Sequence, residues 1–192
     1  MGIPLFALLY LIAAFYYPGG SQFDTDSKGF SWINNYWCNL LNEQALNGEP
    51  NIAKPVAIAA MTVLCMTLAF FWYKFPAGIE AKSWIKQVVR YCGLLAMLTV
   101  SFLGVFDHDG ITKVASLFGV LSVTGMIYML LRQNWRMLFW MGVANVLLVG
   151  VNNLFYYTDG LLRYLPIVQK LAFVFVLLWI WLITNKVRLR ES

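Results

Sequence analysis

Six long apolar stretches, separated by short polar connections, are the feature of this sequence that most limits what it can fold into. They cover roughly residues 2–17, 53–73, 88–106, 113–131, 136–157 and 164–184. All but the first reach the length of about 20 residues at which a helix crosses the hydrocarbon core of a bilayer. Because a backbone inside lipid must satisfy its own hydrogen bonds, each stretch is predicted to be an α-helix.

The composition agrees with a membrane location. Hydrophobic residues make up 60% of the 192 residues and charged residues only 12%, whereas a soluble domain carries about 25% charge. We therefore expect an all-α fold, a polytopic bundle of about six transmembrane helices in a single domain over residues 1–192. The net charge of +5 does not indicate nucleic-acid binding, because the basic residues lie at the ends of the apolar stretches and form no patch with exposed aromatic residues.

Basic residues are divided unequally between the two alternating sets of connections. One set holds nine basic and two acidic residues, and the other holds five basic and seven acidic residues. The nine are Lys74, Lys82, Lys86, Arg90, Arg132, Arg136, Lys186, Arg188 and Arg190. Because cytoplasmic connections carry the excess of Lys and Arg, both chain ends are predicted to be cytoplasmic and residues 18–52 to lie outside.

The longest connection, residues 18–52, predicts an amphipathic helix near residues 31–46 that lies in the outer membrane interface. On a helical wheel, the apolar arc holds Phe30, Ile33, Trp37, Leu40 and Leu41, and the opposite arc holds Asn35, Asn39 and Asn42. Two interpretations follow. The helix is either a lid with Trp37 and Leu41 pointing into the bundle or lipid, or a lid whose asparagines face a ligand.

Small and polar residues mark the expected contacts between helices, because lipid provides no hydrophobic drive for helix association. The candidate contact faces are Gly93, Met97, Ser101 and Gly104 in the third stretch and Thr112, Ser116, Gly119 and Ser122 in the fourth. The third and fourth helices are therefore predicted to pack closely. Asn145, near the middle of the fifth stretch, needs a hydrogen-bond partner there, and it is interpreted as a structural contact or as part of a polar cavity lining.

The few metal-binding and nucleophilic residues exclude several kinds of site. The chain has one histidine, His108, and three cysteines without a CxxC pair, so neither haem nor structural zinc is expected and the cofactor is unknown. The sequence also lacks HExxH, GxSxG and Walker motifs, which leaves no residue with a predicted catalytic role.

Polar residues at the predicted outer ends of the helices form the candidate ligand-binding site. They are Asn42, Glu43, Asp107, His108, Asp109, Asn152, Asn153 and Lys170, with Asp159 and Gln169 nearby. Such residues could perform acid–base chemistry on a lipid head group, hold a divalent cation, or be solvated loop residues. Lys170 either extends to the head groups or pairs with an acid, Asp107 first and Glu43 second.

Three segments resemble a group of bacterial six-helix membrane proteins collected as domain of unknown function 998. The segments are Tyr17-Pro18-Gly19-Gly20-Ser21, Asn35-Tyr36-Trp37-Cys38-Asn39-Leu40-Leu41 and Asn47-Gly48-Glu49-Pro50-Asn51. The group is also similar in organisation to the eukaryotic Frag/DRAM/Sfk proteins. The resemblance implies six helices in the cytoplasmic (inner) membrane of a bacterium, and it brings no catalytic role.

Three functional hypotheses remain. The first is a non-enzymatic membrane protein that binds lipid, a small amphiphile or a membrane partner (another protein or a second copy) at its extracytoplasmic side. The second is an enzyme that acts on a lipid or lipid-linked substrate at the outer leaflet. The third is a small transporter, although the sequence shows neither broken half-helices nor an inverted repeat. These hypotheses differ in whether the outer polar residues line one continuous pocket.

Overall fold

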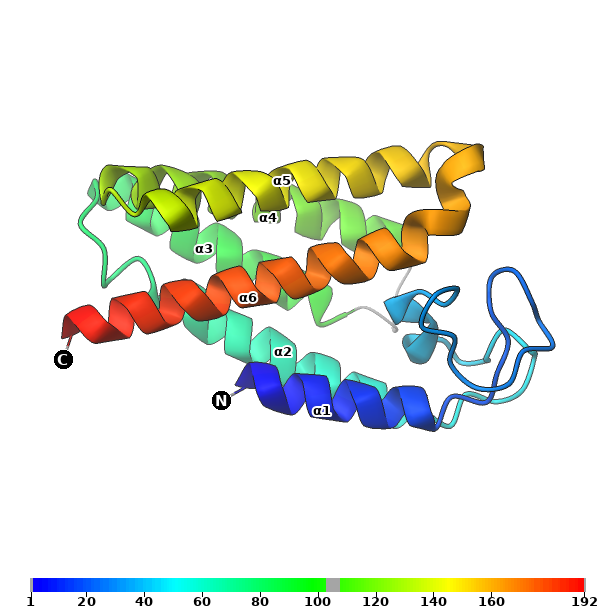
Figure 1. The fold of residues 1–192 in the computed structure, drawn as a ribbon. Coiled ribbons are helices and arrows are strands. Elements are labelled where there is room, and N and C mark those ends of the chain that lie inside the picture. The colour runs from blue at the N-terminus through cyan, green and yellow to red at the C-terminus, as the bar shows by residue number, and fades with distance from the viewer. Residues whose placement is uncertain (1, 103–107, 192) are drawn as a thin grey trace. The chain divides into compact units, whose positions relative to one another are not determined.

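The computed structural model describes residues 2–102 and 108–191, and the regular secondary structure in this part of the chain is helical. Outside the helices, the described residues form turns and two isolated β-bridges. The α-helices are α1 (Gly2–Phe15), α2 (Lys54–Lys74), α3 (Ser83–Val100), α4 (His108–Arg132), α5 (Arg136–Tyr156) and α6 (Leu165–Glu191), and the 3-10 helices are η1 (Trp37–Leu41) and η2 (Asp159–Tyr164). Figure 1 shows their order along the chain. The all-α prediction is confirmed for these residues.

Four of the described helical segments are long and apolar enough to cross a membrane. They are Lys54–Lys74, Gly110–Arg132, Arg136–Tyr156 and Asp159–Arg190. α1 is apolar, but its 14 residues span only about 21 Å at 1.5 Å per residue. α3 has 18 residues, and its first half contains Lys86 and Arg90. The structure therefore shows an all-helical chain with four apolar candidate spans, fewer than the six predicted.

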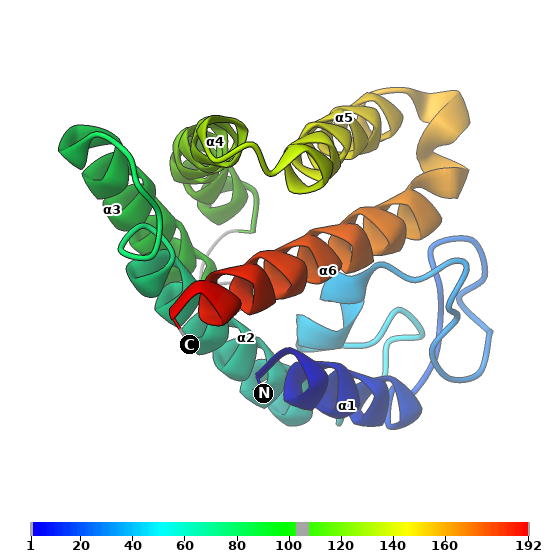
Figure 2. The same ribbon diagram turned by 60° about the vertical axis from the view of Figure 1, so that its left-hand side comes forward.

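The chain forms two compact units, and α2, α5 and α6 contribute to both. The first unit comprises Met1–Val63 and Asn145–Val176. In it, α1 lies beside the first half of α2 in both views (Figures 1 and 2). Residues 16–53, which we call the cap segment, connect these two helices. The buried side of α1 is formed by Phe6, Tyr10, Ala13 and Ala14.

The second unit comprises Leu64–Ala144 and Leu177–Ser192, and small residues set its helix contacts. A Cβ atom added to Gly125 of α4 would lie 2.5 Å from Val89 of α3, so these two helices pack closely, as predicted. The predicted contact residues are confirmed in part, because Gly93 lies against Trp72 of α2 and Ser122 is buried, whereas Gly119 faces open space. A small residue lets any neighbouring helix approach closely, so its presence does not reveal which helix packs against it.

Two connections of the second unit and the end of α6 meet at Gln133. Arg190 Nη1 donates to Gln133 Oε1 at 2.7 Å, and Gln133 Nε2 donates to the Glu80 carbonyl at 3.0 Å. The Arg190 guanidinium also lies 5.0 Å from the centre of the Trp135 ring. The connection after α2, the connection after α4 and the end of α6 therefore come together at one end of this unit.

The predicted amphipathic helix over residues 31–46 is wrong. Only one turn of 3-10 helix forms there, Trp37–Leu41. Asn35 Oδ1 accepts from the Ser31 N–H at 2.8 Å, and Asn39 Oδ1 accepts from the Tyr36 N–H. A continuous helix would use the Tyr36 N–H, and the Asn39 side chain occupies it instead; such competition with the backbone is why asparagine favours turns. Part of the expectation is confirmed, because Leu41 is buried and Trp37 packs on Tyr10.

Candidate functional site

Asparagine side chains fold the cap segment into a fixed shape. Asn51 is buried, and its Nδ2 donates to the carbonyls of Leu40 and Asn42 at 3.1 and 2.9 Å and approaches that of Asn39 at 3.3 Å. Asn35 Nδ2 donates to the Gly20 carbonyl at 2.9 Å. Gly20 has a φ of +81°, and a Cβ there would meet the backbone of residues 46 and 47. A glycine is required at this crossing because no side chain fits.

Seven aromatic rings join the cap segment to α1 and α6. They form one connected aromatic cluster with neighbouring centroids 4.7–6.0 Å apart: Phe6, Tyr10, Tyr17, Phe30, Trp32, Trp37 and Phe173. Tyr10 Oη also donates to the Trp37 carbonyl at 2.9 Å. Each such aromatic pair adds about 0.5–1.5 kcal/mol beyond its buried area, so the cap segment is fastened to the helices by rigid rings.

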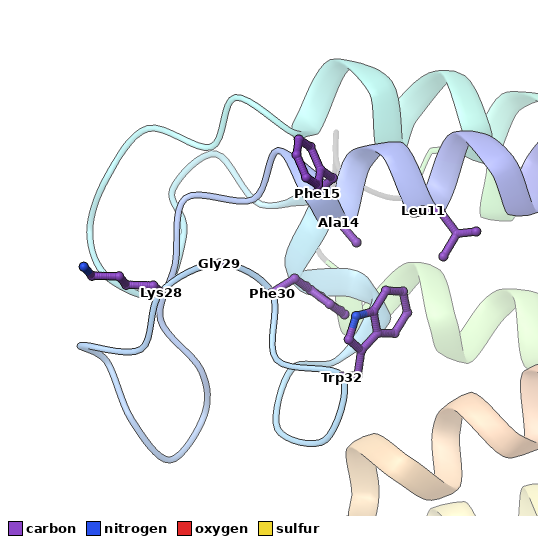
Figure 3. Close-up of a pocket in the computed structure, with 7 residues that line it drawn as sticks. All are labelled: Leu11, Ala14, Phe15, Lys28, Gly29, Phe30 and Trp32. Carbon is purple, nitrogen blue, oxygen red and sulfur yellow. The ribbon is translucent and has the colours of Figure 1, made fainter.

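A groove of about 370 Å³ opens between the end of α1 and the cap segment. Leu11, Ala14 and Phe15 line one side, and Lys28, Gly29, Phe30 and Trp32 line the other. Figure 3 shows the Lys28 side chain directed away from the aromatic rings, so the groove between those rings and α1 is apolar. Leu11, Phe15 and Trp32 are 54%, 84% and 47% exposed. These apolar surfaces face outward and can receive an apolar molecule.

One polar atom beside the groove is unsatisfied. Trp37 Nε1 is buried and has no hydrogen-bond acceptor in the described part of the chain. The Trp37 ring lies 6.0 Å from that of Trp32, which lines the groove. An unpaired buried donor costs about 1–3 kcal/mol, so a ligand that offered an oxygen to this N–H would recover part of that cost.

Lys170 binds backbone carbonyls of its own unit. Its Nζ donates to the carbonyl of Asn35 and, at 3.0 Å, to that of Pro166. The same Nζ lies 5.8 Å from the centre of the Phe30 ring, which adds a cation–π attraction. The neighbouring Gln169 Oε1 accepts from the Trp37 N–H at 3.3 Å. Lys170 therefore faces inward and ties α6 to the cap segment.

The predicted acidic partners of Lys170 are not found among the described side chains. Glu43, the second choice, forms an ion pair with Lys54 instead, and its side chain is 83% exposed. Asp107, the first choice, lies outside the described residues. The described oxygens at the Lys170 ammonium are carbonyls, because the cap segment follows an irregular path that brings its backbone to this group, and the pairing with Asp107 stays a prediction.

The other predicted site residues with described side chains do not come together in one cluster. Asn42 is exposed at the end of η1. Asn153 is exposed and donates to the Val149 carbonyl of its own helix. Asn152 has a buried Oδ1 without a described partner. His108 and Asp109 stand in the first turn of α4, and nothing is described of their side chains. Of the five candidates whose side chains are described, the structure brings only Lys170 to the cap segment's aromatic cluster.

Sequence reasoning overlooked the aromatic residues of the cap segment as a site. Trp32 was not considered, and Phe30 was assigned only to the apolar arc of a helix. A signal was present, because five aromatic residues occur between residues 23 and 37 in a connection predicted to be outside: Phe23, Phe30, Trp32, Tyr36 and Trp37. Aromatic residues of this density in a polar connection indicate a surface that is packed or occupied.

The cap segment also approaches the end of α5. Burial, and to a smaller extent the nearby Tyr156 phenol, raise the pKa of Tyr36 above its ordinary value of 10.0. Within the described residues, no three His, Cys, Asp or Glu side chains lie together as a metal site would require.

The chain matches no family model, no curated protein and no solved structure in the comparisons with known proteins.

Proposed function

We propose that this chain is a non-enzymatic membrane protein that binds a lipid or another small amphiphile at its extracytoplasmic side, in the groove between α1 and the cap segment. The observation that carries the proposal is the groove itself, which is apolar, about 370 Å³ in volume and lined by exposed rings. Ligand sites are concave and mostly apolar, with a few placed polar groups. Here the polar group at the rim is the Lys28 ammonium, and the unsatisfied Trp37 Nε1 lies buried behind Trp32.

Binding is favoured over catalysis by the chemistry of the lining. Lys28 is the one ionisable residue among the seven that line the groove, and Figure 3 shows its side chain directed away from the rings. General acid–base catalysis needs a proton-transferring group within hydrogen-bond reach of the substrate. The groove offers apolar contact, which suffices for holding an acyl or isoprenoid chain.

The membrane topology is part of the proposal: six crossings, with both chain ends in the cytoplasm of a bacterial cell and the cap segment outside. Within the second unit, the contacts among Glu80, Gln133 and Arg190 join three segments that alternating crossings would place on one side. Within the first unit, the cap segment contacts the start of α6 through Gln169 and Lys170. These pairings and the excess of basic residues in one set of connections support the same arrangement.

A photoreactive lipid tests the proposal. The purified full chain is mixed in detergent with a diazirine-bearing fatty acid, irradiated and mapped by mass spectrometry. Labelling is expected on residues 11–15 and 28–32. It should decrease in the variant Leu11→Trp, whose larger side chain fills the groove, and in the variant Trp32→Ala, which lacks one wall of the groove. Trp140→Ala is the matched control, because Trp140 is 65% exposed and lies far along the chain on α5. Equal labelling of all variants would refute the proposed site.

A further inference from the structure

The first half of α3 carries a row of basic residues whose position on the helix is fixed by its neighbours. At 100° per residue, Val89 faces α4 and Gly93 faces Trp72 of α2, while Trp84, Val88, Tyr91, Leu95 and Leu98 form an exposed apolar stripe. Lys86 and Arg90 are one turn apart. Arg90 lies between the exposed stripe and the α2 side, and Lys86 lies on the α2 side close to Gly93; we call this part of the helix the basic flank.

Arg90 is held in place on that flank. Its guanidinium lies 5.2 Å from the centre of the Tyr73 ring, and Tyr73 is the last residue but one of α2. A planar guanidinium stacked on an aromatic ring keeps its edge free to bind an oxyanion. The Arg90 Nε is buried and has no acceptor in the described part of the chain. One N–H of the group is therefore unsatisfied at a position that is already ordered.

Carboxylates do not neutralise this flank within the described side chains. The ion pair found among the described residues, Lys54 with Glu43, lies in the other unit. Lys82, one turn before Lys86, adds a third positive charge, and Lys74 ends α2 next to Tyr73. Glu80 is the nearest acid in the sequence, and it contributes its carbonyl, not its carboxylate, to Gln133. The flank thus offers positive charge and an unsatisfied donor without an acidic counterpart.

We propose that Lys82, Lys86 and Arg90 form a binding site for an anionic phospholipid from the membrane leaflet at this end of the second unit. The phosphodiester accepts from Arg90 and from the lysines, while the acyl chains follow the exposed stripe of α3 that begins at Trp84. A basic flank beside an apolar stripe matches a lipid with a charged head and apolar tails. This site shares no residue with the groove of the first unit and does not depend on it.

The test measures thermal unfolding of the full chain in detergent with added phosphatidylglycerol, phosphatidylcholine or inorganic phosphate. Phosphatidylglycerol is expected to raise the melting temperature of the wild type above the values in the other two. The double variant Lys86→Gln/Arg90→Gln should weaken the apparent affinity for phosphatidylglycerol roughly fivefold for each charge removed. The matched control is Lys186→Gln/Arg188→Gln, which loses the same charge from α6 and should respond like the wild type.

Three outcomes would overturn the proposal. Equal losses of phosphatidylglycerol affinity in both double variants would show a diffuse charge effect. If inorganic phosphate raised the melting temperature as much as phosphatidylglycerol, the site would be one for small anions. A wild-type response to phosphatidylglycerol in Lys86→Gln/Arg90→Gln would exclude these residues. If that variant fails to fold, Lys82→Gln/Lys86→Gln keeps the Arg90–Tyr73 stack and must still bind phosphatidylglycerol less tightly. Labelling of the groove by the fatty-acid probe should be unchanged in either variant, which separates this site from the proposed function.

Discussion

Replacing Asn51 by alanine should loosen the cap segment more than any other single truncation in it. The Asn51 amide donates two hydrogens among three closely placed carbonyls, and its Oδ1 accepts from the Ala53 N–H at 3.2 Å. The variant therefore loses about three hydrogen bonds in a buried setting. At about 1 kcal/mol for each bond, the free energy of unfolding should fall by about 3 kcal/mol. For a chain of this size, that corresponds to a melting temperature roughly 6–12 °C lower.

The assay is tryptophan fluorescence during thermal unfolding in detergent, combined with limited proteolysis of residues 16–53. Proteolysis is included because the cap segment can open locally before the helices unfold. Asn153→Ala is the matched control, since its exposed side chain bonds only a carbonyl of its own helix, and it should change the stability by less than about 0.5 kcal/mol. If Asn51→Ala melts within about 2 °C of the wild type and resists protease equally, the amide does not hold the cap segment together.

Three further predictions concern contacts elsewhere. Gly142→Ala places a Cβ 2.5 Å from the Trp179 ring and should cost about 1–3 kcal/mol by overpacking, whereas Gly150→Ala on the same helix meets nothing within 4 Å and should be neutral or stabilising in the same melt. Tyr10→Phe removes the donor to the Trp37 carbonyl and should lower the stability by about 1 kcal/mol, while Tyr16→Phe, at an exposed tyrosine, should not; equal effects would mean that the hydroxyl bond contributes nothing. Glu43→Gln breaks an ion pair with an 83% exposed acid and should lower the free energy of unfolding by no more than about 0.5 kcal/mol. A larger loss in the same melt would indicate a structural role for this pair.

The helix positions could be predicted from the sequence because length and apolarity determine where a helix can form. α2 and α5 begin and end within one residue of the predicted stretches, and α4 begins at His108, five residues before the predicted start. The first turns of α3 were not predicted, because the charged residues Lys86 and Arg90 were assigned to a connection. Whether α1 and α3 cross the membrane stays a prediction.

The details of the cap segment could not be predicted because they depend on which of two partners an asparagine side chain chooses. The wheel pattern of residues 31–46 is compatible with a helix, and nothing local reveals that Asn35 will bond Gly20, fifteen residues away. The partner of Lys170 was missed for a related reason. Sequence reasoning searches for opposite charges, and carbonyl oxygens leave no mark on the sequence.

The binding of the Lys170 ammonium by backbone carbonyls has an evolutionary consequence. Every residue supplies a carbonyl, so no substitution at position 35 or 166 can delete the acceptors of the Lys170 ammonium, provided that the backbone keeps its path. Positions 35 and 166 are then free of any charge-matching requirement, and the full selective constraint falls on the lysine. Among related sequences, position 170 should accordingly show little variation, and its substitutions should not be correlated with those of an acidic residue. Positions 43 and 54, in contrast, are free to exchange their charges together.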